Sequence, residues 1–190
     1  IALFCNIRNE DVILALDAKN IYEVPIMLHE HGLDTQVLKY FDLDASEVPG
    51  LEKWRDLADK IQNTSHLKDE VRVAIVGKYV KLSDAYKSLI EALTHASFAK
   101  EVKIQIKWVN SRVLNDKNIE DKLSDADAIL VPGGFGSEGI EGMIKAITYA
   151  RVNKVPYLGI CLGMQLAVIE AAQNLCKLEN AYSTEFTPEC

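Results

Sequence analysis

Near the end of this 190-residue chain, a cysteine framed by two glycines stands directly after a short apolar run: Gly159-Ile160-Cys161-Leu162-Gly163. Residues 155–160 are typical of a buried strand and residues 162–175 of a helix, so Cys161 falls at the turn between them. Side chains that flank so sharp a turn would collide, and glycines at 159 and 163 remove those collisions. The pattern predicts that Cys161 is a nucleophile presented at the apex of a strand-to-helix turn.

The predicted helix would also act on the sulfur of Cys161. Its first N–H groups have no partner inside the helix, and they point at that sulfur together with the positive end of the helix dipole. This environment favours a thiolate. A buried structural cysteine is the alternative. The glycine on each side and the change from strand to helix at the residue itself favour the nucleophile.

A second glycine-rich segment follows another apolar strand. Residues 128–131 are apolar and run into Pro132-Gly133-Gly134-Phe135-Gly136. Such a loop lets the backbone approach a ligand closely, and an N–H near Gly134, paired with that of Leu162, would make an oxyanion hole. The loop read alone could be only a tight turn. Because both loops follow strands of one α/β unit, we expect them at the same edge of the sheet, where ligands collect.

Composition excludes several classes of protein. A net charge of −7, without a basic stripe that alternates with aromatic residues, argues against a nucleic-acid partner. No apolar stretch reaches transmembrane length and no signal-peptide pattern opens the chain, so we expect no membrane partner. The four cysteines, Cys5, Cys161, Cys176 and Cys190, show no C-x-x-C spacing. With a reactive thiol among them, a reducing cytoplasm is the predicted location.

Strands and helices alternate from residue 71 onward. This alternation predicts an α/β fold with a doubly wound parallel sheet. The predicted strands cover residues 71–77, 102–109, 128–131 and 155–160, and the predicted helices cover residues 84–99, 140–153 and 162–175.

The first 70 residues follow a different pattern. Residues 1–5 form an apolar run that indicates a strand, and a helix around residues 26–31 should end at Gly32. Residues 42–70 are polar and acidic around one short amphipathic stretch, which indicates a domain boundary. His29 and His31 have no third ligand nearby, so we predict no metal site. The chain opens inside an apolar run and stops abruptly, so we expect a piece of a longer protein.

The two glycine motifs resemble those of a known family. Residues 159–165 together with residues 132–136 resemble the class I (triad) glutamine amidotransferases. The surrounding segments resemble the CTP synthase family in particular, and the likeness spans nearly the whole chain. Those segments are residues 2–6, 73–79, 84–88 and 183–186.

This resemblance implies an activity and a domain organisation. The family makes CTP from UTP: ATP phosphorylates the uracil 4-oxygen, and ammonia released from glutamine displaces the phosphate. Residues 1–50 would be the end of the synthetase (α/β amidoligase) domain, 51–70 a linker, and 71–190 the first part of the glutamine amidotransferase domain. The implied ligands are glutamine, UTP, ATP with Mg²⁺, CTP as a feedback inhibitor and GTP as an allosteric activator, and the implied assembly is a homotetramer.

The resemblance also implies roles for individual residues. Cys161 would attack the glutamine amide, and the backbone at Gly134 and Leu162 would hold the oxyanion. The positions expected to bind glutamine are Gly134, Leu162, Gly163, Met164, Gln165 and Glu185. Leu16, Asp17 and Ala18 fall where family members contact ATP, whereas the ligands of Mg²⁺ are expected outside this chain.

The sequence departs from the family in two places. The family usually reads PGGFG-x-R-G, but Glu138 stands here in place of an arginine of a mobile lid linked to GTP activation, which leaves the response to GTP open. The catalytic histidine and glutamate of the family are expected beyond residue 190. None of the four histidines, His29, His31, His66 and His95, matches that histidine.

Two other functions stay open on the sequence alone. The chain could belong to another class I glutaminase or a related cysteine hydrolase, although residues 1–50 would then be unexplained. It could also be a non-catalytic assembly module, because it carries a nucleophile without its base.

Overall fold

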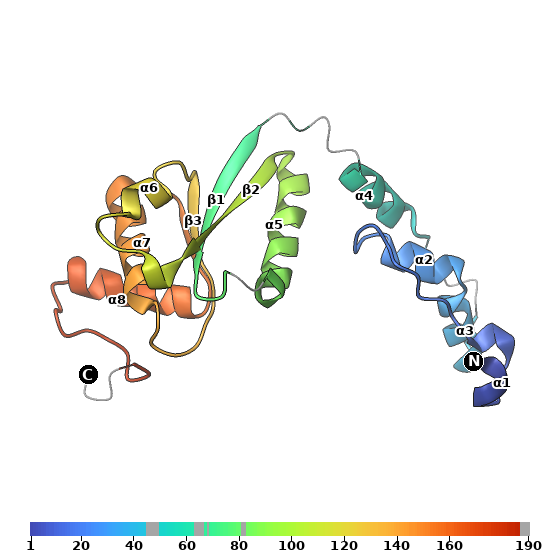
Figure 1. The fold of residues 1–190 in the computed structure, drawn as a ribbon. Helices are drawn as coiled ribbons and strands as arrows, with labels where there is room; N and C mark the ends of the chain where they lie inside the picture. Colours follow the sequence, from blue (N-terminus) through green and yellow to red (C-terminus); the bar gives the residue numbers. More distant parts are fainter. Residues whose placement is uncertain (45–49, 63–66, 68, 81–82, 187–190) are drawn as a thin grey trace. The chain divides into compact units, whose positions relative to one another are not determined.

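The computed structural model describes residues 1–44, 50–62, 67, 69–80 and 83–186. The chain divides into two compact units, residues 1–66 and residues 67–190. In Figure 1 the first unit runs from blue to teal and the second from green to red. Each unit has its own set of secondary-structure elements.

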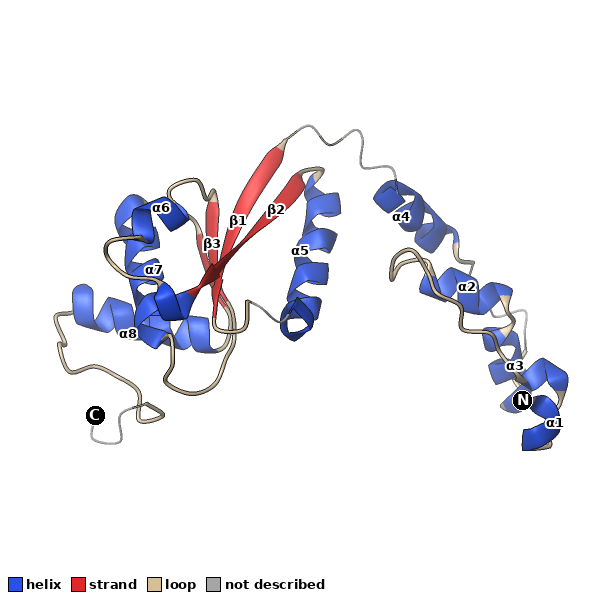
Figure 2. Ribbon diagram, in the orientation of Figure 1, coloured by secondary structure: helices blue, strands red, loops and turns tan. Residues whose placement is uncertain are grey.

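The second unit is built on a parallel sheet of four strands. The strands are β1 (Glu70–Gly77), β2 (Lys103–Asn110), β3 (Ala128–Val131) and β4 (Tyr157–Gly159). Their order across the sheet is β2-β1-β3-β4, and every neighbouring pair is parallel (Figure 2). The predicted α/β fold with a parallel sheet is confirmed.

Helices cover both faces of this sheet. Alternate residues of β1 point to opposite faces: Val73 and Ile75 pack with Leu89 and Leu93 of α5 (Lys87–Lys100). Ala74 and Val76 belong to a larger core formed with α7 (Ile140–Asn153) and α8 (Leu162–Asn174). Figure 1 shows α5 on one side of the strands and α7 and α8 on the other, so the sheet is doubly wound.

The strand order sets the place of the site. Because β1 lies between β2 and β3, the connections that leave β1 and β2 pass to opposite sides of the sheet. Open α/β sheets bind ligands at such a switch point, beyond the carboxyl ends of the strands. The glycine-rich loop follows β3 and the cysteine turn follows β4, so both predicted motifs lie at this edge.

A buried ionic network joins α7 to α8. Glu170 on α8 is only 1% exposed. Its carboxylate accepts hydrogen bonds from Arg151 at 2.8 and 3.0 Å, from Thr148 at 3.0 Å and from Asn174 at 2.9 Å. Both oxygens of the buried carboxylate therefore have a partner, as a charge in a protein interior requires.

The bounds of the elements agree closely with the periodicity of the sequence. The helix predicted over 140–153 has those bounds, and the one predicted over 84–99 begins as a 3₁₀ turn (Ser83–Tyr86) before α5. In the second unit, two short elements were not predicted: a 3₁₀ turn over Ser111–Val113 and the one-turn helix α6 (Ile119–Leu123).

In the described residues, the first unit contains helices and loops and no strand. Its elements are α1 (Ala2–Cys5), a 3₁₀ turn (Asn9–Asp11), α2 (Val24–Glu30), α3 (Leu33–Tyr40) and α4 (Glu52–Gln62). The helix predicted to end at Gly32 is confirmed, since Gly32 follows α2 with φ at 80°. A left-handed residue is a common stop for a helix and suits glycine.

The strand predicted over residues 1–5 is wrong. These residues form a single helical turn, closed by a hydrogen bond from the N–H of Cys5 to the carbonyl of Ile1 at 2.9 Å. The side chains of Leu3 and Phe4 are 90% and 94% exposed. A strand needs a neighbouring strand for its backbone groups, and an apolar run without one closes its hydrogen bonds locally.

The predicted linker, residues 51–70, contains α4 and some residues that are not described. Arg55 of α4 forms an ion pair with Glu30 of α2 at 3.1 Å, so this helix lies in the first unit. The domain boundaries themselves stay a prediction. His29 binds Asp34 at 2.5 Å and His31 binds the carbonyl of Met27 at 2.7 Å.

Within the residues that the structure describes, no helix is long and apolar enough to cross a membrane.

Candidate active site

Cys161 occupies a strained turn between β4 and α8. Its backbone has φ 51° and ψ −108°, a conformation that residues other than glycine rarely adopt. A β-carbon on Gly159 would lie 2.6 Å from the carbonyl carbon of Gly163, so the turn could not close around a side chain there. The steric prediction made for these glycines is confirmed.

The turn is bonded to the neighbouring strand β3. Gly159 pairs with Val131, and the N–H of Ile160 donates to the carbonyl of Val131 at 3.0 Å. The hydroxyl of Tyr157, the first residue of β4, donates to the carbonyl of Gly163 at 2.8 Å. Burial raises the pKa of Tyr157, which keeps this hydroxyl protonated as a donor. These bonds hold Cys161 in its strained conformation.

The glycine-rich loop after β3 lies against the cysteine turn. A β-carbon on Gly133 would be 3.5 Å from the Cβ of Cys161, and one on Gly134 would be 3.5 Å from Cδ2 of Leu162. Leu162 is the first residue of α8, so its N–H has no acceptor inside the helix. The structure thus brings together Cys161, the predicted nucleophile, and the two residues predicted to hold an oxyanion with their backbone.

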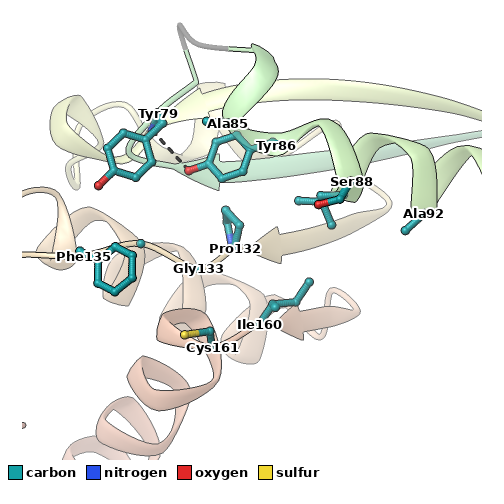
Figure 3. Close-up of a pocket in the computed structure, with 12 residues that line it drawn as sticks. Tyr79, Ala85, Tyr86, Ser88, Ala92, Pro132, Gly133, Phe135, Ile160 and Cys161 are labelled. Atoms are coloured by element: carbon teal, nitrogen blue, oxygen red, sulfur yellow. Dashed lines mark hydrogen bonds between the residues drawn. The ribbon is translucent and has the colours of Figure 1, made fainter. Parts of the chain in front are cut away.

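A cavity of about 560 Å³ opens beside Cys161. In Figure 3, Cys161, Gly133 and Phe135 lie on one side of it, and Tyr79 and Tyr86 lie on the other. The lining is mostly apolar, and cavities of this size hold small molecules. The site therefore has room for a substrate next to the sulfur.

Tyr86 forms the far wall of this cavity, a role that sequence reasoning did not predict. Its ring stacks on Trp108 with centroids 5.8 Å apart, and its hydroxyl accepts a hydrogen bond from the N–H of Tyr79 at 3.3 Å. Burial raises the pKa of Tyr86. A β-carbon at position 77 would lie 2.7 Å from this hydroxyl, so Gly77 is needed for the close approach.

Lys78 is a second functional candidate that sequence reasoning missed. It follows β1 directly, is only 5% exposed, and its ammonium donates to the carbonyls of Phe135, at 3.0 Å, and Gly136. Burial lowers the pKa of Lys78, while the negative charges of Glu185 and Glu138 oppose that effect. The residues around Lys78 in the sequence do not indicate this role, because the carbonyls that accept its hydrogen bonds are 57 and 58 residues away.

Glu138, which differs from the family pattern, has an ion-pair partner in the structure. Glu138 forms an ion pair with Arg112 at 2.9 Å. Arg112 belongs to the 3₁₀ turn after β2, at the same edge of the sheet. A positive charge is therefore present beside the loop although the family's arginine is not.

The structure places the remaining predicted residues as follows. Met164 and Gln165 are exposed on the first turn of α8. Glu185 lies in a turn closed by a hydrogen bond from the N–H of Phe186 to the carbonyl of Ser183 at 3.0 Å. Its negative charge acts against the lowering of the Lys78 pKa. Leu16, Asp17 and Ala18 lie in an irregular segment of the first unit.

Comparisons with known proteins show the family to which the chain belongs. The family model of Glutamine amidotransferase class-I matches residues 81–185, which is more than half of the chain. The chain belongs to the class I glutamine amidotransferase family. A second family model, of the CTP synthase N-terminus, matches residues 1–43.

The relatives of this class I amidotransferase chain include many CTP synthases. The CTP synthase of Geobacter metallireducens is 50% identical over 190 residues, which cover 100% of this chain and 35% of the relative. That of Carboxydothermus hydrogenoformans is 53% identical over 189 residues, with the same shares of the two chains. The chain thus spans about a third of the length of these relatives.

A solved structure shows the same fold. It is the glutaminase domain of Trypanosoma brucei CTPS with bound acivicin, which is similar to this chain with a TM-score of 0.59 and 40% sequence identity. The match covers 63% of this chain and 47% of the other.

Proposed function

We propose that the second unit of this chain hydrolyses glutamine and that the whole protein is a CTP synthase. The observation that carries the proposal is the strained Cys161 turn, which lies against the glycine-rich loop on one side of a cavity. The match to CTP synthases along the whole chain, including the segment before the amidotransferase unit, supports the second part of the proposal.

In the proposed reaction the sulfur of Cys161 attacks the carboxamide carbon of glutamine. A C–S bond forms, and the carbonyl electrons move onto the oxygen. When the carbonyl reforms, the C–N bond breaks and the nitrogen leaves as ammonia after taking a proton. Water then attacks the thioester, which releases glutamate and restores the thiol.

The backbone at Gly134 and Leu162 is suited to the oxyanion of this reaction. Fixed N–H groups that face a developing negative charge stabilise the transition state, and losing one such donor typically reduces kcat by about 10²–10³-fold. We assign the oxyanion hole to these two residues because Leu162 follows Cys161 directly and a β-carbon on Gly134 would lie 3.5 Å from Cδ2 of Leu162.

Glutamine would be held by Gly163, Met164, Gln165 and Glu185. The carboxylate of Glu185 is suited to the α-ammonium of the substrate, since a charge-assisted hydrogen bond contributes about 1.5–3 kcal/mol. The base that accepts the thiol proton is not assigned to a residue of this chain, because none of its four histidines matches the catalytic histidine of the family.

The ammonia would aminate UTP in the synthetase part of the protein. ATP supplies the phosphoryl group that activates the uracil oxygen, and Leu16, Asp17 and Ala18 are the proposed contacts to ATP in this chain. Mg²⁺ is assigned no ligands here, since no group of three or more His, Cys, Asp or Glu in the described residues could hold it. Feedback inhibition by CTP, a homotetramer and a cytoplasmic location complete the proposal.

Activation by GTP is the part of this proposal for which the sequence departs from the family pattern. The lid position occupied by arginine in the family carries Glu138, which binds Arg112. If GTP activates this protein, release of Arg112 from Glu138 would make a cation available beside that position.

A different class I glutaminase is the alternative function. The match of residues 1–43 to the CTP synthase N-terminus favours CTP synthase. A non-catalytic assembly role would leave the strain at Cys161 without a purpose.

The test is a comparison of two reactions in full-length protein that carries Cys161→Ala. CTP formation from glutamine should be lost, whereas CTP formation from added ammonia should stay within about twofold of the unsubstituted protein, because ammonia bypasses the thiol. Equal loss of both reactions would refute this division of labour. Glutamine hydrolysis that survives the substitution would refute the proposed nucleophile.

A further inference from the structure

We propose that Lys78 is a positioning residue for glutamine hydrolysis: its ammonium fixes the glycine-rich loop so that the backbone at Gly134 faces Cys161. This inference rests on the proposed glutaminase function and adds to it a side chain outside both glycine motifs. It is carried by where Lys78 lies and by what else holds the loop.

Lys78 reaches the loop from the neighbouring strand. It follows the last residue of β1, which pairs with β3, and the loop follows β3. Its ammonium donates to the carbonyls of Phe135 and Gly136. Within the described residues, these are the hydrogen bonds that hold those two carbonyls.

The loop has little else to fix it. The side chain of Phe135 is 83% exposed, so burial does not anchor it. Gly136 has φ at 74°, and a β-carbon there would meet nothing within 4 Å. In the described part of the chain, no backbone-to-backbone hydrogen bond is donated by Gly133, Gly134, Phe135 or Gly136. A segment with so few contacts samples several conformations unless a specific bond selects one.

The stem of Lys78 also shapes the loop. Its Cδ and Cε atoms lie 3.4 and 3.7 Å from the position of a β-carbon on Gly134, and Cδ2 of Leu162 lies 3.5 Å from the same position. Gly134 is therefore enclosed between the lysine stem and the first side chain of α8. The ammonium and the stem act on the same few residues.

A buried ammonium is costly unless its donors are used. Lys78 is 5% exposed, and no acidic side chain within the described residues forms an ion pair with it. Its donors go to two backbone carbonyls instead, which are charge-assisted bonds of the stronger kind. The buried ammonium is explained if it fixes the geometry of the glycine-rich loop, because an oxyanion hole stabilises the transition state through preorganised donors.

The experiment compares Lys78→Met with the exposed-site control Lys100→Met in full-length protein. Methionine keeps most of the stem and removes the ammonium. We expect the kcat for glutamine hydrolysis to fall by about 10–100-fold with KM changed by less than about threefold, because oxyanion stabilisation acts in the transition state. The control should keep both constants.

Two further measurements separate positioning from a loss of structure. Alkylation of Cys161 by iodoacetamide needs no oxyanion hole, so its rate in Lys78→Met should stay within about twofold of the unsubstituted protein. Lys78→Arg keeps a cation with several donors, and its kcat should lie above that of Lys78→Met. If the methionine variant does not fold, Lys78→Gln replaces it in both comparisons as the variant without the ammonium.

The inference is overturned if Lys78→Met hydrolyses glutamine at the unsubstituted rate, or if arginine and methionine at position 78 give the same kcat. In either case Cys161→Ala would still abolish hydrolysis, and the proposed function would stand. Hydrolysis that survives Cys161→Ala would instead remove the proposed function itself.

Discussion

A β-carbon on Gly163 would lie 2.0 Å from the carbonyl oxygen of Val131. This contact joins the first turn of α8 to the end of β3, and it brings the helix that carries Cys161 to the strand that carries the glycine-rich loop. The close approach of α8 to β3 therefore requires that position 163 has no side chain.

Gly163→Ala should destabilise the second unit. The added methyl group cannot be accommodated without moving α8 away from β3, and such overpacking typically costs about 1–3 kcal/mol. Chemical denaturation measures the change in the free energy of unfolding. The matched control is Gly133→Ala, where a β-carbon would be 3.5 Å from Cys161, an ordinary contact; equal stability of the two variants would contradict the packing argument.

The strain at Cys161 should appear as a difference between two substitutions. Glycine adopts φ near 51° readily, whereas alanine keeps the penalty that cysteine has. We expect Cys161→Gly to be more stable than Cys161→Ala by about 1 kcal/mol, which thermal or chemical unfolding can resolve. An alanine variant that is as stable as the glycine variant, or more stable, would show that the turn is relaxed.

Glu170 should make the stability of the second unit depend on pH. Burial alone would raise the pKa of Glu170, but hydrogen bonds from Arg151, Thr148 and Asn174 outweigh it and hold the pKa below its ordinary value of 4.5. A lowered pKa in the folded state stabilises the protein above the ordinary value, and this contribution is lost as the pH falls through the lowered pKa.

Glu170→Gln should remove that part of the pH dependence and cost about 1–3 kcal/mol near neutral pH. Unfolding measured at about pH 7 and about pH 4 compares the variant with the unsubstituted protein. The control is Glu179→Gln, an exposed position with no such network. A variant that loses stability on acidification as steeply as the unsubstituted protein would show that Glu170 is not responsible.

Glu185→Gln should raise the KM for glutamine and leave ammonia-dependent CTP formation intact. Loss of a charge-assisted hydrogen bond to the substrate ammonium corresponds to about 10–150-fold in affinity. Steady-state kinetics of full-length protein, with Glu179→Gln as the control, measures it. Unchanged glutamine kinetics would make Glu185 a surface acid.

The sequence predicted the elements whose hydrophobic pattern is strong. The helix over 140–153 and the parallel strands were predictable because apolar residues recur at the spacing of a buried face. The Cys161 turn was predictable because its steric requirement is local: the glycines that relieve it lie within two residues of the cysteine.

Features that depend on distant partners could not be predicted in this way. The ammonium of Lys78 binds carbonyls more than 50 residues later, and Arg151 and Glu170 are 19 residues apart. The apolar run of residues 1–5 predicts a strand, but a run of apolar residues does not indicate whether a neighbouring strand exists. The structure has a helical turn there. The helix α6, with five residues, is too short for periodicity to reveal it.

The central claim is that the turn at Cys161 makes its thiol a nucleophile for glutamine. Exposure alone does not distinguish this thiol, because Cys5, Cys161 and Cys176 are all free and exposed.

The direct measurement is limited labelling with a glutamine-analogue electrophile, followed by mass spectrometry of the peptides that contain the four cysteines. We predict that Cys161 is modified first and that an excess of glutamine slows its modification but not that of the other cysteines. Labelling of all four cysteines at equal rates, unaffected by glutamine, would contradict the claim.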